Sequence, residues 1–453
     1  MTTHRRHVLE RSRRCAETFA RVGDRVEREW ARFDYDDAVL PQLAADALAK
    51  LAPHRSTNGD DIVAWALSQN QLGAQPNASS VFGQPPITVY AGRRFYIETL
   101  HWFDGTTSIH QHSFAGAFSV LEGGSVHTTY AFDAAQPFSP RLRLGDLRFQ
   151  QSDLLAPGDV HPIHPGPAFI HALFHMESPS VSIVIRNTSA SEPGIQYSYL
   201  PPYVAYDPFD RAVWGKRAET YLRGLIAKQS DDLDDFIALA FDHLDTLWAF
   251  RLYEQLFRRD LATSVGVPEP CAERVRTLVT AAAARKFGVY FPALAATVKL
   301  GEARDELIRM RRNITGADER FFLALMLNVP SRARMLALVA QRFPGQRPEA
   351  TIEHCMTALL SDHRTIGVAF EEDAMELVRS ILLGESLAQT LRRLEDRHGR
   401  LDDGEIAAVT AALARLRTSP LLRPFADVDD AEPLAALCAA APSSDALARA
   451  SLG

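Results

Sequence analysis

The sequence of 453 residues contains little cysteine. Its four cysteines, Cys15, Cys271, Cys355 and Cys438, are far apart, and none stands in a C-x-x-C pair. This spacing excludes a zinc site built from paired thiolates and gives no basis for a disulfide framework. We therefore expect free, reduced thiols and a cytoplasmic protein.

Long hydrophobic runs and an excess of positive charge are also missing. No stretch approaches the roughly 20 apolar residues that a membrane-spanning helix needs, and Arg and Glu interrupt the amino terminus where a signal peptide would be apolar. The formal net charge is −7, so the chain lacks the broad basic surface that binds nucleic acid. We expect neither a membrane nor a nucleic acid as partner.

The composition present is that of a globular protein with a large core. Hydrophobic residues make up 46% of the chain and charged residues 23%. The length exceeds that of one ordinary domain and predicts two or three.

Hydrophobic periodicity divides the first half of the chain. Residues 1–75 carry apolar side chains at helical spacing and predict an N-terminal helical segment. A stretch rich in Pro, Asn, Ser and Gly, QPNASSVFGQPP, marks a boundary. Within residues 80–195, apolar residues alternate with period two and turn signals recur about every ten residues. This pattern predicts a barrel or sandwich of short antiparallel strands.

Helical periodicity returns after Pro201-Pro202 and predicts a helical bundle or solenoid-like domain over residues 205–453. The expected fold class is therefore multi-domain α+β: an antiparallel β-barrel flanked by an N-terminal helical segment and a large all-helical C-terminal domain. The helical domain is a candidate surface for a homo-oligomer or for a protein partner.

Histidines are concentrated in the β segment. Eight of the 15 in the chain lie there: His101, His110, His112, His127, His161, His164, His171 and His175. On a strand, His110 and His112 point to the same face, so a third imidazole from a neighbouring strand can complete a mononuclear metal site with open positions. The alternative is a set of hydrogen-bonded core and surface histidines.

Two motifs in this segment resemble the two signatures of the cupin superfamily. GTTSIHQHSFAGAFSVLEG is similar to the first, and GDVHPIHPGPAFIHALFH is similar to the second. The resemblance covers about residues 87–190. It implies that His110, His112 and His171 are the metal ligands, and that His175 stands where many cupins have an Asn.

One difference from most cupins indicates which branch of the superfamily the chain resembles. Most cupins have a glutamate ligand after the second histidine, and the matching residue here is Gly116. A site of three histidines alone resembles the thiol (cysteine) dioxygenase branch, which implies Fe(II). A glycine in place of the carboxylate raises the charge of the site, and we expect it to open space for an anionic substrate.

The likeness to that branch is weaker on the strand that follows the third ligand. Where the thiol dioxygenases have Ser, His and Tyr, this chain has Ser182, Val184 and Arg186, and Ala117 replaces the cysteine that animal enzymes link to the tyrosine. An ordinary cysteine dioxygenase is therefore not predicted. Arg186 either clamps a substrate carboxylate beside the metal or is a surface arginine at a strand end.

The remaining histidines have competing interpretations. His175 shares a strand face with the third ligand, so it is a candidate proton carrier or hydrogen-bond partner. His161 and His164 either line a channel or cap turns. His101 and His127 are expected to be satisfied barrel residues.

The sequence thus predicts an O2-dependent Fe(II) oxygenase that acts on a small polar molecule, with a thiol or a carboxylate as the candidate group. His110, His112 and His171 would bind the metal, and His175, Ser182 and Arg186 would assist catalysis. Zn, Ni, Mn and Cu remain possible metals, and native Zn or Ni would indicate an isomerase or hydrolase. The alternative function is a non-catalytic sensor or assembly module that binds a metal or ligand.

The helical domain contains a second candidate metal site. Acidic residues near two histidines are reminiscent of di-iron bundles: Glu353, His354, His363, Glu371, Glu372 and Glu376. A Glu-x-x-His pair is absent, which favours solvated helix faces.

Overall fold

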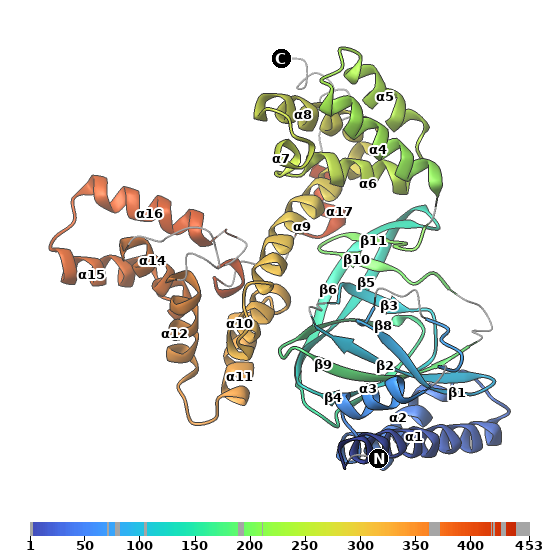
Figure 1. Ribbon diagram of the computed structural model, residues 1–453. Coiled ribbons are helices and arrows are strands. Elements are labelled where there is room, and N and C mark those ends of the chain that lie inside the picture. Colours follow the sequence, from blue (N-terminus) through green and yellow to red (C-terminus); the bar gives the residue numbers. More distant parts are fainter. Residues whose placement is uncertain are drawn as a thin grey trace. The chain divides into compact units, whose positions relative to one another are not determined.

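The computed structural model describes residues 3–69, 72–77, 82–103, 107–188, 194–210, 212–361, 372–417, 419, 422–426 and 432–440. Helices lie at both ends of the sequence, with the strands between them (Figure 1). The predicted fold class is confirmed: an antiparallel barrel is flanked by N-terminal helices and a large helical C-terminal region. Within the described ranges, no helix combines the length and the apolarity needed to cross a membrane.

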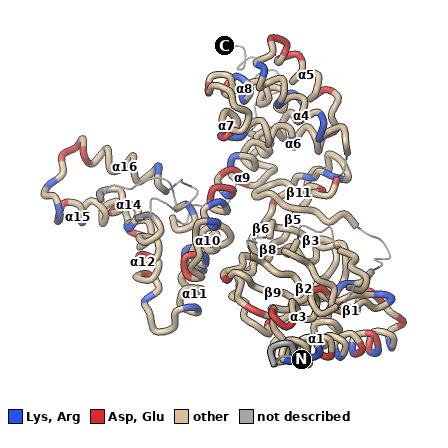
Figure 2. Tube along the Cα trace, in the orientation of Figure 1, with Lys and Arg blue, Asp and Glu red and all other residues tan. Residues whose placement is uncertain are grey.

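Three helices precede the strands: α1 (Thr3–Trp30), α2 (Leu40–Leu51) and α3 (Gly59–Ser68). The side chain of Asn58 caps α3 by accepting a hydrogen bond from the backbone N–H of Asp61. The apolar faces of the helices share a core with strand residues, while charges of both signs follow one another along α1 (Figure 2). The helical periodicity of the sequence thus produces a layer with one buried and one solvated face.

The strands form two groups. A five-stranded sheet has the order β1-β2-β9-β4-β7, and a closed barrel has the order β10-β11-β6-β5-β8-β3. The bounds are β1 (Pro86–Ala91), β2 (Phe95–Trp102), β3 (Ile109–His112), β4 (Gly116–Glu122), β5 (Ser125–Ser139), β6 (Leu142–Leu155), β7 (Val160–Ile163), β8 (Gly166–His175), β9 (Ser180–Asn187), β10 (Ser198–Leu200) and β11 (Val204–Tyr206).

Two parts of the strand arrangement differ from the sequence-based expectation. The strands β5 and β6 have 15 and 14 residues, whereas the sequence predicted only short strands. Strand β11 follows Pro201-Pro202, where only helix was expected, and it pairs with β6. The helical region therefore begins after β11 rather than at residue 205.

Contacts divide the chain into two compact units that do not follow the order of the sequence. Unit 1 consists of Met1–Ala131, Phe149–Ile195 and Leu307–Asp429. Unit 2 consists of Phe132–Arg148, Gln196–Glu306 and Asp430–Gly453. All candidate site residues of the barrel lie in unit 1.

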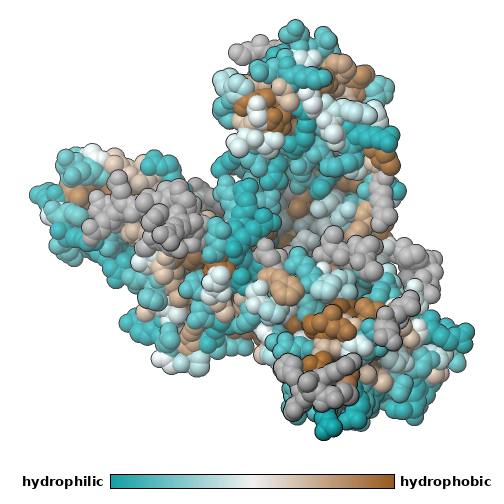
Figure 3. All heavy atoms as spheres, in the orientation of Figure 1, coloured by the Kyte–Doolittle hydropathy of each residue, from teal (hydrophilic) through white to brown (hydrophobic). Residues whose placement is uncertain are grey.

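The helices after the barrel belong to both units. In Figure 3 the surface of the helical parts is mainly hydrophilic. Helix α9 (Phe291–Arg311) contributes to both. The helices of unit 2 are α4 (Val213–Ala227), α5 (Leu233–His243), α6 (Thr246–Phe257), α7 (Leu261–Val265), α8 (Glu269–Phe287) and α17 (Leu434–Ala440). Those of unit 1 are α10 (Ala317–Asn328), α11 (Arg332–Arg342), α12 (Pro348–Ser361), α14 (Glu372–Leu383), α15 (Leu387–His398) and α16 (Asp403–Arg417).

Helix α10 is part of the core of unit 1. All of its residues from Arg320 to Asn328 are buried. They share one hydrophobic cluster with Val126, Phe174 and Met176 of the barrel segment. Because side chains on a strand alternate between faces, these apolar residues face the helices, and their neighbours on β5 and β8 face the barrel interior.

Two buried arginines connect the helices of unit 1 to the end of β8. The Nη2 of Arg311 donates to the carbonyl oxygen of His175 at 3.0 Å, and the Nη1 of Arg320 donates to that of Met176 at 3.3 Å. Their exposed fractions are only 1% and 6%. Buried guanidinium groups need such polar partners, so the helices from Leu307 onward are integral to the barrel's packing.

Candidate metal centre

Three histidines from two adjacent strands converge in the barrel. His110 and His112 lie on β3, and His171 lies on β8, directly opposite His110 in the strand register. All three are buried, and one ligand nitrogen from each lies within 4.8 Å of the others. Among the described residues, this is the only group of three or more His, Cys, Asp or Glu side chains that could hold a metal ion.

Hydrogen bonds orient two of these rings. The Nδ1 of His110 lies 2.8 Å from the carbonyl oxygen of Ser108. A carbonyl only accepts, so this Nδ1 carries the proton, and Nε2 keeps its lone pair for a metal. The Nδ1 of His171 lies 3.1 Å from the Nε2 of His127, while its own Nε2 lies 2.9 Å from the Nε2 of His112.

Burial keeps the three imidazoles neutral. It lowers the pKa of His110 to about 4, against an opposing effect of the Ser108 carbonyl. Burial, and then the neighbouring His110, lower the pKa of His112 and of His171 well below the ordinary value. Neutral imidazole is the form that binds metals, so the group is ready to accept an ion near neutral pH.

The donor set fits a transition metal. Imidazole suits Fe, Ni, Cu and Zn, and three protein ligands leave coordination positions free for other molecules.

Aromatic side chains surround the group. The ring of Phe169 lies 4.5 Å from that of His171, and the ring of Phe114 lies 4.7 Å from that of His112, measured between centroids. Phe118 is 5.6 Å from His171. This apolar surrounding excludes water and strengthens electrostatic interactions at the site.

The expected open space at Gly116 is not present. A Cβ atom on Gly116 would lie 1.8 Å from the carbonyl oxygen of Ile185, on the paired strand β9. The missing carboxylate thus reflects close contact between two strands, and the glycine opens no room for a substrate.

This contact predicts a large loss of stability in Gly116→Ala. We expect the free energy of unfolding to fall by about 3 kcal/mol, at the upper end of overpacking effects, because backbone atoms must move. Urea unfolding followed by circular dichroism measures it. Gly224→Ala, on an exposed part of α4 where a Cβ meets nothing within 4 Å, is the matched control and should not destabilise. An equally stable Gly116→Ala protein would contradict this packing.

Arg186 lies beside the group rather than on the outer surface. Its guanidinium is 4.0 Å from the ring centroid of Phe114 and contributes to the lowered pKa of His112, after burial and His110. Nη1 pairs with the carboxylate of Glu98 at 3.2 Å. Nε is buried and has no hydrogen-bond partner in the described part of the chain. Arg186 is therefore a cation near the centre with one free donor.

Ser182 and His175 belong to a different part of the interior. The Trp102 indole donates to the Ser182 hydroxyl at 3.2 Å and stacks on the His175 ring at 4.6 Å. The Nδ1 of His175 lies 2.9 Å from the Ser125 hydroxyl and 2.8 Å from the Ser180 hydroxyl. Burial, and then Arg311, lower the pKa of His175 to about 3. No hydrogen bond or ring contact joins His175 to the three histidines across the described ranges.

His127 is the functional candidate that the sequence analysis missed. It is buried on β5 and contacts His171, whereas it was expected to be an ordinary barrel residue. His161 is half-buried with its ring 4.7 Å from that of His127, and His164 is exposed. His101 is buried on β2, in the five-stranded sheet. The only sequence signal for His127 is the concentration of histidines itself.

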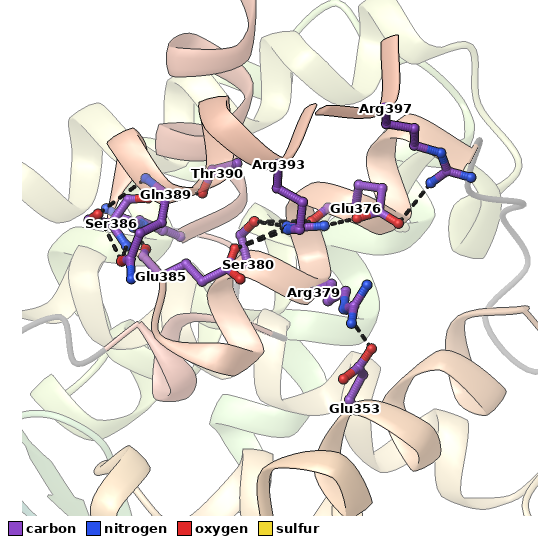
Figure 4. A network of polar contacts seen from close by, with 11 residues as sticks. Glu353, Glu376, Arg379, Ser380, Glu385, Ser386, Gln389, Thr390, Arg393 and Arg397 are labelled. Carbon is purple, nitrogen blue, oxygen red and sulfur yellow. Dashed lines mark hydrogen bonds and ion pairs between the residues drawn. The ribbon is translucent and has the colours of Figure 1, made fainter. Parts of the chain in front are cut away.

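The acidic residues of the helical domain are paired with arginines. Glu353 forms an ion pair with Arg379 at 2.7 Å, and Glu376 forms ion pairs with both Arg393 and Arg397 (Figure 4). His363 and Glu371 lie outside the described residues, as does the side chain of Glu372. The described carboxylates thus form an ion-pair network between helices.

The fold and the site together define a class: an antiparallel barrel protein with a buried three-histidine group that can bind a metal ion. No family model matches the chain, and no curated protein matches it. The function must therefore be argued from the chemistry of the site.

Proposed function

We propose that this protein is a mononuclear non-haem iron protein of the cupin kind and an oxygenase that oxidises a small polar molecule. The observation that carries the proposal is the convergence of three neutral imidazoles, from His110, His112 and His171, in an apolar interior. Among the metals that imidazole suits, we propose Fe(II), because a site of three histidines without a carboxylate resembles that of the thiol dioxygenases. When bound there, Fe(II) would supply the redox chemistry that O2 activation needs.

The protein's own residues bind and orient the substrate in this proposal. The Nε of Arg186 is free to donate to an anionic group of the substrate, and its pairing with Glu98 keeps the guanidinium in place. The aromatic rings around the histidines exclude water. Ser182 and His175 would order the hydrogen bonds of the adjoining interior, and neutral His175 would hold a proton at one ring nitrogen.

Metal analysis followed by oxygen uptake tests the proposal. The protein is purified without oxygen, its metals are measured, and oxygen consumption is followed with thiols, amino acids and 2-oxo acids. We expect about one iron per chain and oxygen uptake that begins only when a substrate is added. Native zinc or nickel would refute the oxygenase and favour an isomerase or hydrolase.

A sensor or assembly module is the alternative, because a large helical region packs on the strands that carry the histidines. Tight ligand binding without oxygen consumption would favour it.

A further inference from the structure

The Nδ1 atoms of the three candidate ligands have different surroundings. His110 is held by the backbone carbonyl of Ser108. The Nδ1 of His112 is buried and has no hydrogen-bond partner in the described ranges. The Nδ1 of His171 is instead in contact with another side chain, at 3.1 Å from the Nε2 of His127. The hydrogen bond at the Nδ1 of His171 can therefore be removed by substituting one side chain, His127.

When a metal is bound, the contact between His127 and His171 allows only one placement of the ring protons. Binding through Nε2 of His171 requires a lone pair there, so its Nδ1 carries the proton and donates. The Nε2 of His127 must then accept, which places the proton of His127 on its Nδ1. That atom is buried and has no other hydrogen-bond partner in the described ranges, so no competing bond opposes this tautomer.

The His127 ring is itself held firmly. It is 1% exposed, and the ring of Phe118 meets it edge-on at 5.6 Å. The strand register pairs His127 with Leu173 and Thr129 with His171, which places His127 diagonally next to the ligand. The ring can hold His171 because it has little freedom to move.

We propose that His127 is a positioning residue of the metal centre, which holds His171 by hydrogen bonding so that Nε2 faces the ion. Partners of this type usually are carboxylates or backbone carbonyls, and here a neutral imidazole takes that place. The inference rests on the metal site of the proposed function, but it does not depend on oxygenase activity.

Two substitutions of His127 distinguish the effect of its hydrogen bond to His171 from the effect of its packing. His127→Gln keeps an acceptor oxygen on a side chain long enough to reach His171, whereas His127→Leu fills similar space without an acceptor. Loss of a partner to a ligating histidine typically weakens metal binding 10- to 100-fold. We expect a loss of that size in His127→Leu and a change of no more than a few-fold in His127→Gln.

The measurements are the dissociation constants for Zn(II) and Co(II), from competition with a chelating dye, and the visible absorption spectrum of the Co(II) form. The cobalt spectrum reports ligand geometry, so a merely structural role for His127 would leave it unchanged. His164→Gln, at an exposed position of the same segment, is the control and should behave like the wild type. If His127→Leu does not fold, His127→Asn, whose shorter side chain does not reach His171, replaces it.

Wild-type affinity and an unaltered cobalt spectrum in His127→Leu would overturn the positioning role. Equal weakening in the Gln and Leu variants would overturn it too, because hydrogen bonding would then not matter. Failure of the wild type to bind any metal would refute both this inference and the proposed function. Weakened binding in the Leu variant alone, in a protein that consumes no oxygen, would support the positioning role and refute only the oxygenase.

Discussion

Replacing His171 with alanine is expected to abolish stoichiometric metal binding. Loss of an outer partner already costs 10- to 100-fold in affinity, so loss of a ligand should cost at least about 100-fold. His110→Ala and His112→Ala should behave in the same way, because the three nitrogens form one group. Elemental analysis of protein purified without oxygen measures the metal content, and titration with Co(II) measures the affinity.

His164→Ala is the matched control for these substitutions. His164 lies in the same segment as His171 but is exposed, and it should retain full metal content. The folded state of each variant is checked by circular dichroism. An alanine variant that is folded and holds as much metal as the wild type would show that the ion binds elsewhere.

Acid is expected to unfold the metal-free protein at an unusually high pH. Burial lowers the pKa of His110 to about 4 and those of His127 and His175 to about 3, whereas each takes up a proton near pH 6.5 in an unfolded chain. Between these limits the unfolded state binds more protons, so the free energy of unfolding falls as the pH falls. Stability is therefore full above pH 6.5 and is lost progressively toward about pH 3.

The magnitude of the acid effect is large compared with ordinary stability. Each such histidine contributes about 1.4 kcal/mol per pH unit in this window, so these three contribute about 4 kcal/mol per unit, against a typical total of 5–15 kcal/mol. His112 and His171, whose pKa is also lowered, add to this slope. Urea unfolding of chelator-treated protein at pH 7.5, 6.5 and 5.5 measures the slope. His175→Phe should reduce the slope by the share of one histidine. A stability that is constant between pH 6.5 and 5.5 would contradict the buried, neutral state of these rings.

The parts of the fold that the sequence predicted are those with a local signal. Alternating apolar residues identified strands such as Phe95–Trp102 and Ser180–Asn187 because one of their faces is buried. The second half of β5 has no buried residue and lacks this alternation. The strands β10 and β11 have three residues each, and only their pairing with distant residues makes them strands.

The part of the candidate site that has a local sequence signal was also predictable. The shared face of His110 and His112 follows from their spacing alone. That His171 lies opposite His110 depends on the register of two strands about sixty residues apart in sequence, and the resemblance to a known motif supplied it. The role of His127 depends on the register of β5 with β8, for which the sequence holds no local signal. The close contact at Gly116 is likewise a property of the assembled sheet.

The way α10 packs has a practical consequence for dissection of the protein. A fragment cut after residue 195 would leave Phe174 and Met176 facing water and would remove the arginine donors from the carbonyls of His175 and Met176. Such a fragment should aggregate or melt at low temperature, even though it would contain every candidate ligand. The barrel with its candidate ligands and the helices of unit 1 that come later in the sequence therefore have to be expressed and purified as one chain.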